Sequence, residues 1–142
     1  MRHAVVPAVY AILMKDDKLL LMLRQNTGYR DGFYTLPSGH VEKNETPTQA
    51  VIRELVEEVG IKEDVKNFKY CFTLFRKSEL DEERVDHFFI VTTDKEPTNA
   101  EPDKCKNIMW ADKNSLPENF FDYIRFALSK IDKKKIYAEW GY

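Results

Sequence analysis

Residues 39–61 read GHVEKNETPTQAVIRELVEEVGI, and this stretch governs the interpretation of the whole chain. Its second half carries the local signals of a helix. Thr46 suits the N-cap, Pro47 suits the first helical position, and Gln49 completes a capping box. Gly60 provides the stop. The spacing therefore predicts a helix that begins after Thr46 and ends at Gly60.

The predicted helix has an apolar face and an acidic face. At 100° per residue, Glu54, Glu57 and Glu58 fall within roughly 100° of arc. These carboxylates repel one another, and the helix dipole near the C-terminus also disfavours negative charge. A hard divalent cation would reverse the interaction, so the face suggests a metal site. The alternative is a solvated acidic face in which Arg53 pairs with Glu57. The opposite face is expected in the core: Val51, Ile52, Leu55, Val56 and Val59.

The full spacing of the stretch matches a known pattern. It reads Gly39, five residues, Glu45, seven residues, then Arg53-Glu54-Leu55-x-Glu57-Glu58-x-Gly60-Ile61. This pattern resembles the box of the Nudix hydrolases at every position. At on the order of one in twenty per residue type, a chance match at the seven glycine, glutamate and arginine positions is on the order of one in 10⁹. Ser38 departs from the commoner second glycine before Gly39, which affects the loop and leaves the box intact.

The resemblance implies a fold, a reaction and a cofactor. The implied fold is α/β (α+β), a Nudix-type α/β/α sandwich around a mixed β-sheet. The implied reaction is attack of water on the pyrophosphate of a nucleoside diphosphate derivative. Adjacent phosphates repel a nucleophile, so such a reaction needs divalent ions, here Mg²⁺ or Mn²⁺.

The resemblance also assigns roles to box residues. Glu54 and Glu57 match catalytic positions, with Arg53 orienting the carboxylates and Glu45 supporting them. For Arg53 and Glu45, an ordinary exposed ion pair is the competing interpretation. The residues implied to hold the metal are the Gly39 carbonyl, Glu54, Glu57 and Glu58.

Two candidates outside the box rest on position alone. Arg24 ends a predicted strand and resembles a phosphate-binding arginine of MutT-like enzymes, against the alternative of a surface arginine. Glu101 resembles a late acidic residue that serves some members as a metal ligand or base, against a solvated loop carboxylate. His40 has no partner for a zinc site and is interpreted as a loop residue. Three aromatic residues are candidates either for stacking on a base or for packing: Tyr29, Phe33 and Trp110.

The flanking sequence predicts further elements. Residues 5–14 and 19–23 are apolar runs joined by Asp16-Asp17, which predicts a β-hairpin. Aromatic and β-branched runs predict a second strand pair at 67–76 and 84–93. Shorter extended segments are expected at 33–36 and 108–110, and helical periodicity predicts an amphipathic helix within 117–131.

Composition limits the class of protein. The 142 residues suit one domain, expected to span 1–142, and 43% are hydrophobic, which is enough to form a core. The formal charge of −2 disfavours duplex nucleic acid and anionic membranes as partners. No transmembrane run or signal peptide is recognisable, so a cytoplasmic location is expected. Cys71 and Cys105 have no CxxC partner and are interpreted as free thiols.

Three functions are compatible with the sequence. The first is a MutT-like pyrophosphohydrolase acting on a (d)NTP or another small nucleotide. The second is a Nudix hydrolase of nucleotide sugars such as ADP-ribose, or of capped RNA, because loops outside the box select the substrate. The third is a non-catalytic nucleotide sensor, which the intact glutamates disfavour. A small nucleotide is the expected partner, and a homodimer is compatible with the sequence.

Overall fold

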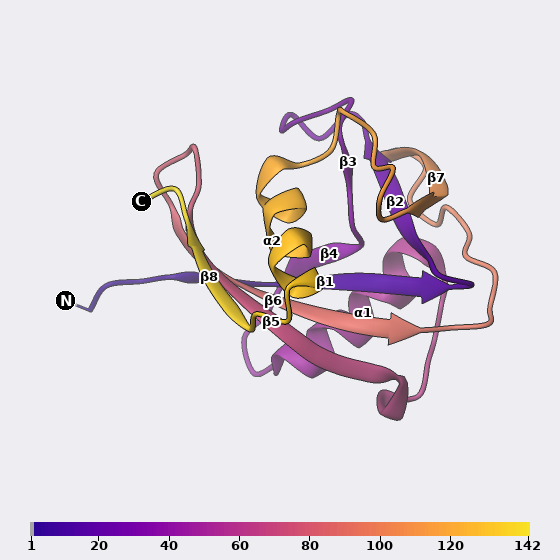
Figure 1. The fold of residues 1–142 in the computed structure, drawn as a ribbon, viewed down its shortest axis with the longest axis horizontal. Coiled ribbons are helices and arrows are strands. Elements are labelled where there is room, and N and C mark those ends of the chain that lie inside the picture. Colours follow the sequence, from indigo (N-terminus) through magenta and orange to yellow (C-terminus); the bar gives the residue numbers. More distant parts are fainter. Residues whose placement is uncertain (1) are drawn as a thin grey trace.

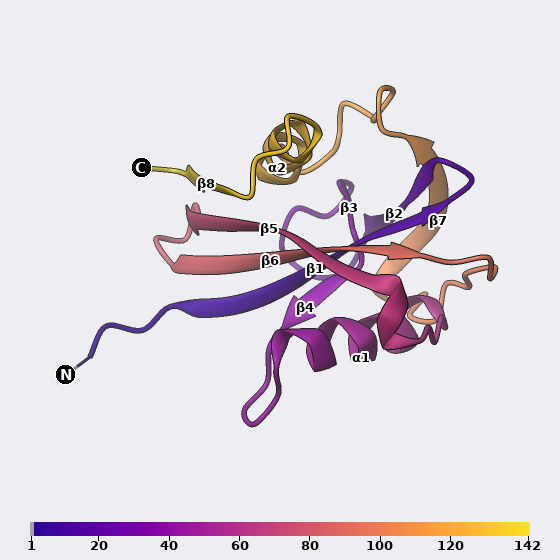
Figure 2. The ribbon, with the colours of Figure 1, turned by 60° about the horizontal axis from the view of Figure 1, so that its bottom comes forward.

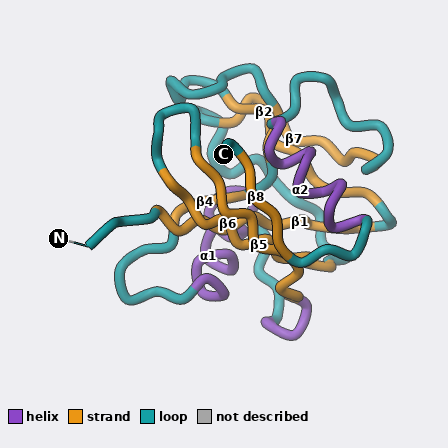
Figure 3. The backbone as a smooth tube through the Cα atoms, turned by 60° about the vertical axis from the view of Figure 1, so that its left-hand side comes forward, coloured by secondary structure: helices purple, strands orange, loops and turns teal. Residues whose placement is uncertain are grey.

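The computed structural model describes residues 2–142, which form a central sheet with one helix on each face (Figures 1 and 2). Figure 3 shows the strands as the middle layer and the loops that join them. The elements are β1 (Val6–Lys15), β2 (Lys18–Arg24), β3 (Tyr34–Thr35), β4 (Ser38–His40), α1 (Pro47–Val59), a 3-10 turn (Val65–Asn67), β5 (Phe68–Lys77), β6 (Glu83–Thr92), β7 (Cys105–Asp112), α2 (Asp122–Asp132) and β8 (Tyr137–Trp140).

The sheet is mixed. Its main order is β3-β2-β1-β6-β5-β8, with β4 paired to β1 and β7 paired to β2. The β1–β6 and β5–β8 pairs are parallel, and the other strand pairs are antiparallel. This architecture is the α/β/α sandwich with a mixed sheet that the sequence predicts.

Strands β1 and β2 pair only beside their turn, where Met14 faces Leu19 and Lys15 faces Lys18. Asp16 and Asp17 both have positive φ, 51° and 64°, as a tight two-residue hairpin turn requires. Farther from the turn, β4 takes over the pairing with β1, with Gly39 opposite Val9. The first hairpin is confirmed, and its two strands part to admit the first residues of the box.

Each face of the sheet has its own core because side chains alternate along the strands. On β1, Tyr10 and its neighbours on the same face pack toward α2, whereas Val9 and Leu13 pack toward α1. Phe72 and Phe88 fill the α2 side without exposure to solvent. The two cores fix both helices against one sheet, as Figure 2 shows.

Helix α1 has the predicted ends. The Thr46 hydroxyl accepts from the Gln49 amide, the Gln49 side chain accepts from the Thr46 amide, and Gly60 adopts φ 68°. The apolar face differs from the prediction at one position. Val51, Leu55 and Val59 are buried as expected and Ile52 is partly buried, but Val56 is 43% exposed. Val56 stands at the edge of the apolar arc, which the sheet does not reach.

Three other elements differ from expectation. Helix α2 begins at Asp122 and not near 117, because Tyr34 binds the Asn119 carbonyl and accepts from the Phe121 amide, which holds that segment extended. Strand β4 lies within what sequence reasoning treated as a loop. Strand β8 was not predicted, since its four residues become a strand only by pairing with β5.

Cys71 and Cys105 are free thiols, as predicted. Within the described residues, no helix is both long and apolar enough to cross a bilayer.

Candidate active site

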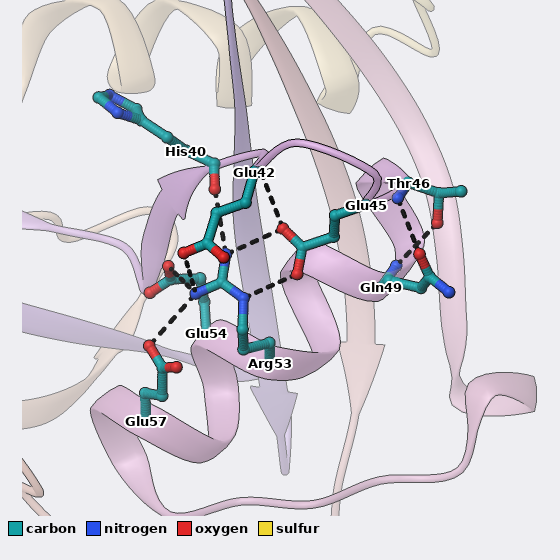
Figure 4. A network of polar contacts seen from close by, with 8 residues as sticks. All are labelled: His40, Glu42, Glu45, Thr46, Gln49, Arg53, Glu54 and Glu57. Carbon is teal, nitrogen blue, oxygen red and sulfur yellow. Dashed lines mark hydrogen bonds and ion pairs between the residues drawn. The ribbon is translucent and has the colours of Figure 1, made fainter.

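The guanidinium group of Arg53 stands at the centre of the polar network in Figure 4. Its Nε donates to Glu45 at 2.7 Å, and Nη2 donates to Glu45 at 3.0 Å and to the His40 carbonyl at 3.1 Å. Its Nη1 donates to Glu54 at 2.8 Å and to Glu57 at 3.2 Å. A guanidinium has five N–H groups, so this set uses all of them. Arg53 thus joins the loop before α1 to two carboxylates on α1.

The network shifts the pKa values of its members. Hydrogen bonds from Arg53 lower the pKa of Glu45, whose Oε1 also accepts from the Glu42 amide at 2.9 Å. The Glu45 and Glu54 carboxylates in turn raise the pKa of Arg53. Both predicted positioning residues, Arg53 and Glu45, therefore contact the box carboxylates or each other, beyond a simple pair between Arg53 and Glu57.

Position 39 has no room for a side chain. A Cβ atom at this position would overlap the Glu54 carboxyl group and stand 2.8 Å from the Glu54 Cγ. Pairing of β4 with β1 places the Gly39 backbone against α1. The glycine therefore lets the β4 backbone approach a box carboxylate closely.

Glu58, one turn after Glu54 on α1, also contacts strand β4. Its Oε1 accepts from the Ser38 amide at 2.8 Å. Burial, followed by the nearby Glu54 carboxylate, raises the pKa of Glu58 well above its usual value. Burial also raises the pKa of Glu54. Two crowded, partly desolvated carboxylates are under electrostatic stress that a bound cation would relieve.

Glu101 lies on a loop that is fastened to both sides of the site. The Ala100 amide donates to the Glu58 carbonyl at the end of α1 at 3.1 Å. The Gln25 side chain donates to the Pro102 carbonyl at 2.8 Å, and the Glu101 carbonyl accepts from the Cys105 amide at 2.9 Å. This loop brings the Glu101 carboxylate into the same cavity as the three box glutamates.

Arg24 ends β2 opposite α1. Its Nε donates to the Tyr29 carbonyl at 2.9 Å and its Nη2 donates to Thr27 Oγ1 at 3.0 Å. These bonds fix the guanidinium, and Arg24 lines two adjacent cavities.

The first cavity has a volume of about 490 Å³ and two walls of opposite charge. Four glutamates form the acidic wall, and Arg24 and Lys104 are the cations on the side of β2 and β7. The acidic lining residues are Glu54, Glu57, Glu58 and Glu101.

The donor set fits a hard divalent cation, because such ions prefer carboxylate and carbonyl oxygens. In the present rotamers, no three acidic, histidine or cysteine side chains between residues 2 and 142 converge closely enough to hold an ion. The reason is visible in the contacts, since Arg53 holds Glu54 and Glu57 and the Ser38 amide holds Glu58. The Glu57 side chain is 51% exposed and is the one freest to turn toward the others.

A second cavity of about 280 Å³ adjoins the first on the α2 side of the sheet and shares Arg24 and Ser38 with it. Its walls include the rings of Tyr29, Phe121 and Tyr123. Arg30 braces these walls by pairing with Glu79 and Asp122 at 3.0 Å each.

The floor of the second cavity is polar and buried. Arg76 pairs with Asp86, which has no exposed surface, and Arg84 Nε lies 3.9 Å from Asp86 Oδ1. These last two atoms have no hydrogen-bond partner in the structure.

The remaining candidates separate clearly. Tyr29 and His40 line the second cavity, and the His40 carbonyl also binds Arg53. Trp110 packs against the α1-side core, and the Phe33 ring contacts Phe121.

Two groups of the site were not predicted from the sequence, the Ser38 amide and Lys104. A backbone donor leaves no signal in residue type, and Lys104 becomes relevant only once its loop is placed.

Comparison with known proteins agrees with this geometry. The family model described as NUDIX domain matches residues 4–129. The MutT NUDIX hydrolase of Burkholderia pseudomallei superposes with a TM-score of 0.80 at 25% identity, covering 89% of this chain and 98% of that one. The MutT protein of Methanosarcina mazei Go1 gives a TM-score of 0.80 at 18% identity, covering 94% and 96%. The chain belongs to the Nudix family.

Two relatives of this chain are named for different activities. The ADP-ribose pyrophosphatase of Methanocaldococcus jannaschii is 33% identical over 119 residues, which is 82% of this chain and 67% of that protein. The NAD-capped RNA hydrolase NudC of Shigella flexneri is 46% identical over 66 residues, 46% of this chain. The match spans only 24% of the length of that second relative.

Replacing Gly39 by alanine should disable the site while leaving the fold. The methyl group would displace Glu54, and a displacement of about 1 Å in a site can cost on the order of 100-fold in rate. We expect kcat/KM for hydrolysis to fall by at least about tenfold with an unchanged far-UV circular dichroism spectrum. The control is Ser115→Ala, an exposed change outside both cavities, because every other glycine of the chain has a positive φ at which a side chain is strained. Equal activity of the two variants would contradict the close packing of Gly39 on Glu54.

Divalent metal should stabilise the folded chain, because it relieves repulsion among Glu54, Glu57 and Glu58. We expect a higher melting temperature in Mg²⁺ than in EDTA. A KCl solution of equal ionic strength controls for general screening. Identical melting temperatures in all three solutions would show that these carboxylates do not bind the ion.

Proposed function

We propose that the chain catalyses Mg²⁺-dependent hydrolysis of the pyrophosphate linkage in a nucleoside diphosphate derivative, with a (d)NTP or related small nucleotide as substrate. The observation that carries this proposal is the first cavity, in which four carboxylates face Arg24 and Lys104. An acidic wall suits divalent cations, and a basic wall suits phosphate oxygens.

Each wall has a chemical task. Glu54, Glu57, Glu58 and Glu101, with the Gly39 carbonyl, would hold Mg²⁺, which supplies charge neutralisation of the phosphates and a more acidic water. Arg53 keeps Glu54 and Glu57 in position through its five hydrogen bonds. Arg24 binds a phosphate oxygen. A carboxylate of the acidic wall takes the proton of the attacking water as the new P–O bond forms and the bridging oxygen leaves.

The second cavity supports a nucleotide substrate. It joins the first at Arg24 and Ser38, so one molecule can occupy both. Aromatic walls and a buried polar floor suit a planar ring that stacks and forms hydrogen bonds. We assign the phosphates to the first cavity and the nucleoside to the second.

Hydrolysis of a nucleotide sugar is the second candidate. It is favoured by the relative from Methanocaldococcus jannaschii, named as an ADP-ribose pyrophosphatase, which matches 82% of this chain. Hydrolysis of NAD-capped RNA has weaker support, because that resemblance is confined to 66 residues.

The deciding experiment is a hydrolysis screen at fixed Mg²⁺ over dNTPs, ADP-ribose and NAD. Chromatography of the products identifies the phosphorus attacked. Release of pyrophosphate and a nucleoside monophosphate from a dNTP would support the first candidate. AMP and ribose 5-phosphate from ADP-ribose alone would support the second. No turnover of any substrate, with nucleotide binding retained, would favour a non-catalytic sensor.

Removing the charge of Glu57 should abolish most activity. Glu57→Gln keeps nearly the same shape, and loss of an acid–base or metal-binding group typically costs about two to four orders of magnitude in kcat. The exposed Glu118→Gln is the matched control and should behave as wild type. Full activity of Glu57→Gln would rule out α1 as the catalytic metal site.

Arg24→Ala and Glu101→Gln should change different kinetic constants. If Arg24 binds phosphate equally in the ground and transition states, its loss raises KM, by roughly tenfold for a charged hydrogen bond, more than it lowers kcat. If Glu101 acts in activating water, its loss lowers kcat with little change in KM. Steady-state kinetics at saturating Mg²⁺ separate the two patterns. Wild-type constants for either variant would return that residue to a surface role.

A further inference from the structure

Lys104 is a cation of the first cavity that has no part in the catalytic steps proposed above. It stands on the fastened loop, three residues after Glu101 and directly before β7. Its backbone is held at both ends, because its amide donates to the Glu101 carbonyl at 3.0 Å and its carbonyl accepts from the Gln25 amide at 2.9 Å. The base of this side chain is therefore fixed beside the site.

The Lys104 side chain forms no ion pair within the described residues. Lys104 is exposed, and although four glutamates line the same cavity, its ammonium forms no ion pair within residues 2–142. Arg24, by contrast, donates hydrogen bonds to Thr27 and Tyr29. Strand pairing sets Arg24 opposite Cys105, so Lys104 adjoins Arg24 on the basic wall. A free ammonium beside the proposed phosphate site can neutralise charge that the metal and Arg24 would not reach.

Charge balance indicates which substrate needs this ammonium. A nucleotide sugar carries two phosphates, both within the linkage that the acidic wall and its cation would neutralise. A nucleoside triphosphate carries one more ionised phosphate and needs one more cation. We propose that Lys104 binds the additional phosphate and selects triphosphates over nucleotide sugars. The inference rests on the proposed function, since it assumes that phosphates occupy the first cavity.

The test compares Lys104→Met and Lys104→Arg with the wild type on a dNTP and on ADP-ribose. Lys106→Met is the matched control, because Lys106 is also exposed, lies on β7 and stands outside the cavity lining. We expect Lys104→Met to lower kcat/KM for the dNTP about tenfold, as for loss of one charged hydrogen bond, and to leave ADP-ribose within about twofold. Lys104→Arg should restore much of the dNTP activity.

Binding provides a readout that does not require turnover. Calorimetry with a non-hydrolysable imidotriphosphate and with ADP-ribose, both in Mg²⁺, should show the same selective loss in Lys104→Met. If the wild type hydrolyses neither substrate but Lys104→Met still weakens only the imidotriphosphate, the proposed function fails and the role of Lys104 stands. Equal losses for both ligands, or no loss, would overturn the selection by Lys104.

Discussion

The site depends on the five hydrogen bonds of the Arg53 guanidinium. Two go to Glu45, one to the His40 carbonyl, and one each to Glu54 and Glu57. Without this cation, the carboxylates would face each other across a few ångströms at the end of a helix that already disfavours negative charge. A lysine has only three donors on a single nitrogen and could not span these groups. The arginine therefore keeps a repulsive acidic cluster in order.

A second constraint is the short strand β4. It lies between β1 and α1, and each of its three residues contributes to the site through the backbone. The Ser38 amide binds Glu58, the Gly39 backbone packs on Glu54, and the His40 carbonyl binds Arg53. Because strands β1 and β2 separate beyond their turn, there is room for β4 in the sheet. The sheet thus fixes the backbone groups that contact Glu58, Glu54 and Arg53.

Local chemistry explains what the sequence could predict. The caps at Thr46 and Gly60, the turn at Asp16 and Asp17, and the grouping of glutamates on α1 all depend on residues within one or two turns of each other. Other features depend on partners far along the chain. Strand β8 requires β5, and the late start of α2 requires the bonds between Tyr34 and the segment before the helix. The exposure of Val56 depends on where the sheet ends, which helical periodicity does not specify.

The same distinction applies to the functional residues. The box fixes Glu54, Glu57 and Glu58 because their spacing is a property of one helix, whereas Glu101 and the basic wall come from β2 and the loop before β7. That loop is placed by bonds to the carbonyls of Val59 and Glu58 at the end of α1 and by the side chains of Gln25 and Asn26. Changes in the opposing loop can therefore leave the box carboxylates on α1 in place. A site built this way can change the residues of the basic wall and the second cavity without disturbing the box carboxylates.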